Sequence, residues 1–170
     1  MFSFALWDNE NKSITLVKDR FGEKPLYYGW NNNSFIFGSE IKAIKLHPEF
    51  DNEIDRNSIA LQMRHCYIPS PFSIFKNLRK VPPGSYIQTF LKDFRKYNNP
   101  IKYWDFKSNI EFYQKETLNL KVNNLCSSLE NLLKDVISDQ MISDMPLGAF
   151  LSGGIDSSLI SKDLGWKPLY

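Results

Sequence analysis

The stretch SGGIDSS at residues 152–158 is the most informative local signal in this chain. The small, apolar run at 147–151 before it predicts a short buried strand. Its paired glycines let the backbone turn tightly and approach a ligand closely. The residues that follow predict the start of a helix, where free N–H groups and the helix dipole attract an anion. The stretch therefore predicts a strand–loop–helix cradle for pyrophosphate or triphosphate.

The side chains of the stretch suit the same ligand. Hydroxyl groups add neutral donors, and Asp156 can hold a metal ion that accompanies the phosphates. The candidate residues are Ser152, Gly153, Gly154, Asp156, Ser157 and Ser158. An ordinary turn followed by an N-cap is the alternative, but the order of strand, glycine pair, acid and hydroxyls favours a phosphate loop. The absence of a following Gly-Lys-Ser/Thr argues against a Walker-type NTPase, and the loop resembles that of the PP-loop ATP pyrophosphatases.

Composition excludes several other classes of protein. The chain has 170 residues and is 42% hydrophobic, which is enough to bury a core. Its net charge is +2, with acidic and basic residues interspersed, so no nucleic-acid or membrane partner is expected. No signal peptide or membrane-length apolar stretch is evident, and we expect a cytoplasmic protein.

The cysteines and histidines form no recognisable reactive or metal-binding pattern. Cys66 and Cys126 lie far apart without a paired spacing, so we expect buried, unreactive thiols. His47 and His65 form no metal motif, and we expect an ordinary surface or turn position for each.

The pattern of apolar residues divides the chain into two parts. The first part predicts strands at 2–8, 13–19, 26–30, 34–39 and 86–90, a short helix at 40–44 capped by Ser39, and a longer helix at 55–66. Residues 91–122 are polar and weakly patterned, which predicts the end of a hairpin and then a linker. Apolar residues from Leu125 to Met141 recur at the helical period and predict an amphipathic helix before the phosphate loop.

This second part predicts the beginning of an α/β nucleotide-binding domain. A lone strand with one helix on each side does not make a doubly wound sheet. We therefore expect the chain to be a fragment that spans a domain junction.

Seven strings occur in an order that carries a family resemblance. They are MFSFALWD at 1–8, DRFGEKPLYY at 19–28, FGSEIKA at 37–43, YIP at 67–69, VPPG at 81–84, YW at 103–104 and MPLGAFLSGGIDSS at 145–158. Together they resemble the glutamine-hydrolysing asparagine synthetases, over residues 1 to about 160.

The resemblance implies a fold and a division into domains. Residues 1–104 would form the C-terminal half of a type-2 glutamine amidotransferase domain, a partial α/β/β/α sandwich. Residues 105–122 would be a linker. Residues 123–170 would be the truncated start of a PP-loop asparagine synthase domain, with its first helix–strand–loop–helix.

The resemblance also implies an activity. Members of the family free ammonia from glutamine and adenylate aspartate with Mg-ATP, so ATP and Mg are the expected cofactors and aspartate, glutamine and ATP the expected substrates. The six loop residues carry over as the pyrophosphate site, with Asp156 as a Mg ligand, and Phe150 matches a position whose backbone lies beside the adenosine. The resemblance also allows a homodimer of the complete protein.

Departures from the family pattern imply that this chain is inactive alone. Met1 is not followed by the nucleophilic cysteine, and neither Cys66 nor Cys126 occupies its position, so no catalytic residue is assigned. The strings that hold glutamine and aspartate are absent. After Ile160 the sequence departs from the family's apolar helix, which suggests a frameshift or a truncated reading frame.

Two alternatives remain open. One is a ligase of the same plan acting on another carboxylate, such as a related amidotransferase or a β-lactam synthetase, because the loop predicts adenylation and not the acceptor. The other is a non-catalytic truncated protein that only binds a partner.

Overall fold

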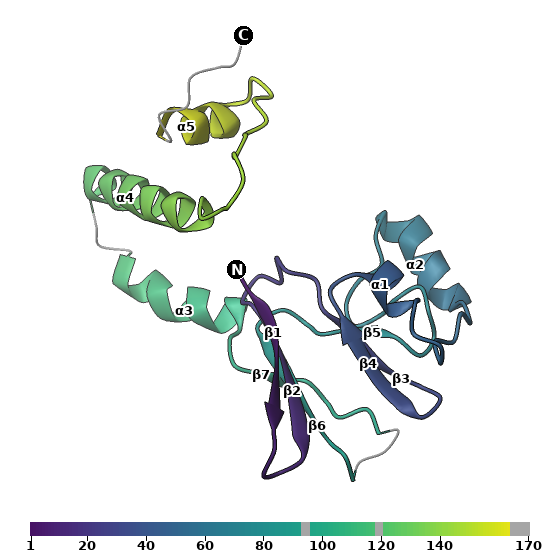
Figure 1. Cartoon of the computed structure of the whole chain (residues 1–170). Helices are drawn as coiled ribbons and strands as arrows, with labels where there is room; N and C mark the ends of the chain where they lie inside the picture. The colour runs from purple at the N-terminus through teal and green to yellow at the C-terminus, as the bar shows by residue number, and fades with distance from the viewer. Residues whose placement is uncertain (93–95, 118–120, 164–170) are drawn as a thin grey trace. The chain divides into compact units, whose positions relative to one another are not determined.

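The computed structural model describes residues 1–92, 96–117 and 121–163. The chain divides into two compact units, Met1–Ile110 and Glu111–Tyr170. The structure is a mixed α+β protein whose described residues form two antiparallel sheets and five helices (Figure 1). Among those helices, none is long and apolar enough to cross a bilayer.

The first unit contains both sheets. The larger sheet has the strand order β1-β2-β6-β7, and the smaller sheet has the order β4-β3-β5. Their strands are β1 Ser3–Asp8, β2 Ser13–Lys18, β3 Tyr27–Asn31, β4 Ser34–Gly38, β5 Arg79–Lys80, β6 Ser85–Phe90 and β7 Ile101–Lys102. These positions confirm the five strands expected from the sequence.

Two apolar clusters cover the two faces of the smaller sheet. The first joins it to the larger sheet and contains Leu16, Leu26, Tyr28, Val81 and Ile87, all at most 4% exposed. The second lies on the opposite face, around helix α1 Ile41–Ile44, and contains Ile36, Ile44, Phe50 and Leu78. Side chains alternate between opposite faces along a strand, so the smaller sheet forms a middle layer between the larger sheet and a helical layer.

Helix α2 Arg56–His65 begins as expected, because the side chain of Asp55 accepts a hydrogen bond from Asn57 N at 3.0 Å. It ends at Cys66, whose φ of 61° places it in the left-handed region typical of helix ends. For α1, however, the predicted cap is wrong: Glu40, not Ser39, is the N-cap residue, and it makes no side-chain capping bond.

The second unit consists of helices and irregular segments in its described part. Helix α3 Phe106–Thr117 crosses the boundary between the units and lies within the segment expected to be a linker. Helix α4 Val122–Gln140 confirms the amphipathic helix, and α5 Ile155–Asp163 begins within the candidate phosphate loop at 152–158.

The strand predicted at 147–151 is not formed. This segment has no regular secondary structure, and Phe150 is fully exposed. Every strand of the described residues lies between residues 3 and 102, so the second unit offers no strand with which 147–151 can form a ladder. A strand satisfies its backbone groups only through a neighbouring strand, which explains why an apolar run alone did not produce one.

Candidate phosphate loop and the residues that support the fold

The phosphate loop at 152–158 turns at Gly153, whose φ is +79°. A Cβ at this position would meet no atom within 4 Å, so the preference for glycine comes from the left-handed backbone and not from crowding. The turn leads directly into α5, where Ser158 N donates to Gly154 O at 3.1 Å. The first amides of a helix lack acceptors within the helix, so they are available to an anion.

The structure brings together two of the predicted hydroxyl groups. Ser152 Oγ lies 3.1 Å from Ser157 Oγ, and Ser157 Oγ donates to Gly154 O at 3.1 Å. The serine pair therefore spans the loop from its first residue to the first turn of the helix.

The remaining predicted residues are less constrained. Asp156 lies exposed in the first turn of α5. Phe150 contributes only an exposed ring two residues before the loop. Throughout the part of the chain that the structure describes, no group of three or more His, Cys, Asp or Glu side chains is arranged to hold a metal ion. One carboxylate beside hydroxyl groups nevertheless suits Mg²⁺, which commonly binds through one or two carboxylates, phosphates and water.

Both cysteines are exposed, which corrects the expectation of buried thiols. Cys66 ends α2 at the surface. Cys126 lies on α4, a helix with no buried residue. The sequence showed only that the two cysteines have no paired spacing, and this spacing does not determine whether a cysteine is buried.

Three of the strings that carry the family resemblance meet in the first unit. Gly84 N donates to Asp19 O at 2.8 Å, and Tyr103 N donates to Gly84 O at 2.9 Å. A Cβ at Gly84 would lie 2.6 Å from the carbonyl oxygen of Trp104, and φ there is +61°, so only glycine fits. The rings of Phe21 and Trp104 pack edge to face, with centroids 5.0 Å apart. The sequence did not predict this junction, because its segments are separated by about sixty and twenty residues.

Asp19 is the polar centre of this junction. It is 4% exposed and accepts hydrogen bonds from three backbone amides: Phe2 N at 3.0 Å, Glu23 N at 2.8 Å and Lys24 N at 3.2 Å. Burial alone would raise the pKa of Asp19, but the donations from Lys24, Glu23 and Phe2 outweigh it and hold the pKa below its ordinary value. The carboxylate thereby fixes both the beginning of the chain and the loop at 19–25.

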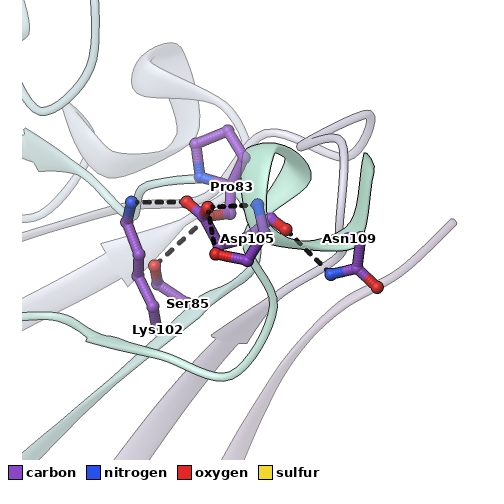
Figure 2. A network of polar contacts seen from close by, with 6 residues as sticks. Pro83, Ser85, Lys102, Asp105 and Asn109 are labelled. Carbon is purple, nitrogen blue, oxygen red and sulfur yellow. Dashed lines mark hydrogen bonds and ion pairs between the residues drawn. The ribbon is translucent and has the colours of Figure 1, made fainter. Parts of the chain in front are cut away.

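A second carboxylate organises the start of α3. Figure 2 shows Asp105 between Lys102 and Asn109, and the bond drawn from Ser85 goes to the carbonyl oxygen of Pro83. Its Oδ1 accepts from Lys102 Nζ at 3.0 Å, and its Oδ2 accepts from Ser108 N at 3.1 Å, which caps the helix. The bond from Lys102, followed by those from Ser108, lowers the pKa of Asp105 to about 2. An aspartate cap three residues before a serine was the available sequence signal for this helix.

Comparison with protein families gives two matches along the chain. Residues 1–104 match the model of the glutamine amidotransferase domain, and residues 128–163 match that of asparagine synthase. The second match includes the phosphate loop.

Comparison with curated proteins gives relatives of one description. A putative glutamine-hydrolysing asparagine synthetase 2 of Methanocaldococcus jannaschii is 35% identical over 94% of this chain and 30% of its own length. The glutamine-hydrolysing asparagine synthetase 3 of Bacillus subtilis is 34% identical over 95% of this chain and 25% of its own length. The chain thus spans less than a third of these relatives.

Proposed function

Because the chain belongs to the glutamine amidotransferase family over residues 1–104 and continues into the start of an asparagine synthase domain, we propose that it takes part in ATP-dependent synthesis of asparagine with ammonia from glutamine. In this proposal residues 1–104 form the C-terminal half of an α/β/β/α glutaminase sandwich. Residues 105–122 connect it to residues 123–170, which begin a PP-loop domain. The relatives are described as asparagine synthetases, which favours aspartate over another acceptor carboxylate.

The proposed reaction has two steps. A side-chain carboxylate oxygen of aspartate attacks the α-phosphorus of ATP, and the bond from that phosphorus to the bridging oxygen breaks and releases pyrophosphate. Ammonia then attacks the acyl carbon, the bond from carbon to the AMP oxygen breaks, and a proton is released with AMP. Mg²⁺ would supply charge neutralisation of the phosphates when bound.

The phosphate loop has the features needed to stabilise the departing pyrophosphate. Gly153 turns the chain so that the amides at the start of α5 are available to negative charge. The hydroxyls of Ser152 and Ser157 flank this point, and Ser158 follows in the first turn. Preorganised donors aimed at developing charge are a large source of rate enhancement in enzymes. This loop, within the region matched to asparagine synthase, is the observation that carries the proposal.

The nucleophile for glutamine hydrolysis is proposed to lie outside this chain. Cys66 and Cys126 are exposed at the end of α2 and along α4. Among the described residues, no base forms a hydrogen bond with either thiol, and such a base is what activates a catalytic thiol.

A chimera tests the proposal directly. The 164 residues of the Methanocaldococcus relative that match this chain would be replaced by the matching residues of this chain. We expect ammonia-dependent formation of AMP and asparagine, and Gly154→Val should reduce AMP formation about a hundredfold or more by displacing the phosphates.

Gly154 is the informative glycine for this test. A Cβ there makes only ordinary contacts of 3.5 and 3.7 Å with serine hydroxyls, so the substitution does not strain the loop itself. Gly148→Val is the matched control, since a Cβ there meets nothing within 4 Å and lies outside the loop. Unchanged AMP formation in Gly154→Val would refute the loop assignment. If the chimera does not fold, Mg-pyrophosphate should still shift the NMR signals of residues 152–158 in the 170-residue chain.

A further inference from the structure

The first unit contains a cavity with a volume of about 200 Å³ that is unrelated to the phosphate loop. Its lining comes from β3, α1, α2, the 68–74 segment and β5, and consists of Tyr27, Ile41, Gln62, Ile68, Ser73, Ile74 and Lys80. The volume corresponds to that of about six or seven water molecules. Three isoleucines provide an apolar wall, and four side chains provide polar groups.

Lys80 brings a positive charge to this cavity. Its Nζ donates to the carbonyl oxygen of Ile68 at 2.5 Å, and none of the described residues supplies a carboxylate that pairs with it. An ammonium group has three donors, so two remain for other acceptors. Partial burial lowers the pKa of Lys80, which reflects the cost of holding an unneutralised charge partly away from water.

The charge surroundings of Lys80 also favour an anion. Lys18 is 7% exposed, and its pKa is lowered by burial and by the positive charge of Lys80, while Asp19 acts in the opposite direction. The carboxylate of Asp19 is already held by the three backbone amides described above. It makes no ion pair with Lys80.

Two neutral hydroxyl groups line the cavity with Lys80. Ser73 is 2% exposed, and its Oγ accepts from Phe75 N at 3.2 Å. No acceptor for its hydroxyl hydrogen occurs within the described segments, so this buried donor remains available. Burial raises the pKa of Tyr27, which keeps its phenol protonated and able to donate.

We propose that this cavity, hereafter the Lys80 cavity, binds a small organic carboxylate with a short branched apolar body. The carboxylate accepts from the Lys80 ammonium and from the hydroxyls of Ser73 and Tyr27. The apolar body packs against Ile41, Ile68 and Ile74. A charged group that is removed from water is stabilised by a partner of opposite charge and by hydrogen bonds, and this ligand supplies both.

NMR titration of the ¹⁵N-labelled 170-residue chain with isovalerate tests the proposal, with isovaleramide as the neutral ligand of the same shape. We expect isovalerate to shift the amide signals of residues 68, 73 and 74 in a saturable manner. Loss of a charge-assisted hydrogen bond should make isovaleramide bind about tenfold more weakly or worse. Equal binding of the two ligands, or no shift with isovalerate, would overturn the proposal.

Lys80→Met removes the ammonium and keeps the apolar stem of the side chain. It should weaken isovalerate binding by about tenfold or more. Lys42→Met is the matched control, because Lys42 follows Ile41 but is exposed at the surface, and it should leave binding unchanged. Full affinity in a folded Lys80→Met chain contradicts the proposal. If that variant does not fold, the comparison of isovalerate with isovaleramide decides. Tighter binding of inorganic phosphate than of isovalerate would contradict the apolar part of the assignment.

Discussion

Strand β2 and helix α4 both carry regular apolar patterns, but they differ in what covers them. In β2, Leu16 is completely buried against Tyr28, Val81 and Ile87. In α4, by contrast, no residue is buried, and its apolar side includes Leu129 and Leu132, at 55% and 59% exposure. Apolar periodicity indicates which face of a helix or strand favours burial, but burial itself requires a partner surface from another segment. An apolar pattern can therefore form a helix or strand without placing it in a core, as in α4, whereas β2 is stabilised by the core that covers it.

Hydrogen exchange should give the largest contrast between the two units. We expect the amides of β2 and β6 to exchange about ten-thousandfold more slowly than those of α4, because opening β2 requires the loss of a core worth roughly 5 kcal/mol. Exchange followed by NMR measures both sets in one sample of the 170-residue chain. Similar protection in α4 and β2 would contradict this expectation and show that the second unit is itself stably folded.

Truncation of one leucine in each unit compares how much a buried and an exposed leucine stabilise the fold. Leu16→Ala should lower the free energy of unfolding by about 2–5 kcal/mol, because it leaves a cavity among fully packed side chains. Leu132→Ala should change it by no more than about 0.5 kcal/mol, since its side chain is largely exposed. Urea unfolding followed by far-UV circular dichroism, which reports on the strands of the first unit and on helix α4, measures both. A large effect of Leu132→Ala would show that α4 packs against a surface in solution.

The smallest expected effect is local and concerns the start of α3. The pKa of Asp105, about 2, lies below its ordinary value of 3.8, so its contribution to the helix is present above pH 3.8 and is lost as the pH falls through about 2. The ¹³Cα shifts of residues 106–109 should therefore lose helical character over this range.

Two variants separate the charge of Asp105 from its capping oxygen. Asp105→Ala should reduce the helical shifts at every pH, because Ser108 N loses its acceptor. Asp105→Asn retains an oxygen acceptor and should remove the pH dependence. Helical shifts in Asp105→Ala that match those of the unchanged chain would mean that the cap does not hold α3.

Local signals predicted much of the fold. Alternation identified the strands from 2–8 to 86–90, and the Asp55 cap preceded α2 as expected. The strand at 147–151 was wrong because strand formation depends on a partner elsewhere in the chain. Helix α3 was missed although Phe106, Ile110 and Tyr113 recur at the helical period and its cap was present, because the polar residues between them favoured a linker.

The two candidate sites also differ in whether the sequence alone could predict them. The phosphate loop is contiguous, so its glycine turn and serine pair follow from seven adjacent residues. The Lys80 cavity draws its lining from residues 27, 41, 62, 68–74 and 80, and only the folded chain brings these together. No spacing in the sequence predicts such a site, because its members share no element.

The hydrogen bonds of Asp19 have a consequence for how this protein can vary. Its carboxylate accepts hydrogen bonds from the backbone amides of residues 2, 23 and 24, and these amides are present whatever side chain each of those positions carries. Replacements other than proline at the three positions should therefore be tolerated. At position 19, glutamate would place its carboxylate one methylene too far, and asparagine would direct an N–H group toward the backbone donors. The loop can therefore vary at 23 and 24, but not at Asp19, nor at Gly22, where φ is +73° and a Cβ would lie 2.8 Å from Pro83 Cγ. A library randomised at 19–25 and selected for folding should return aspartate at 19 and varied residues at 23 and 24.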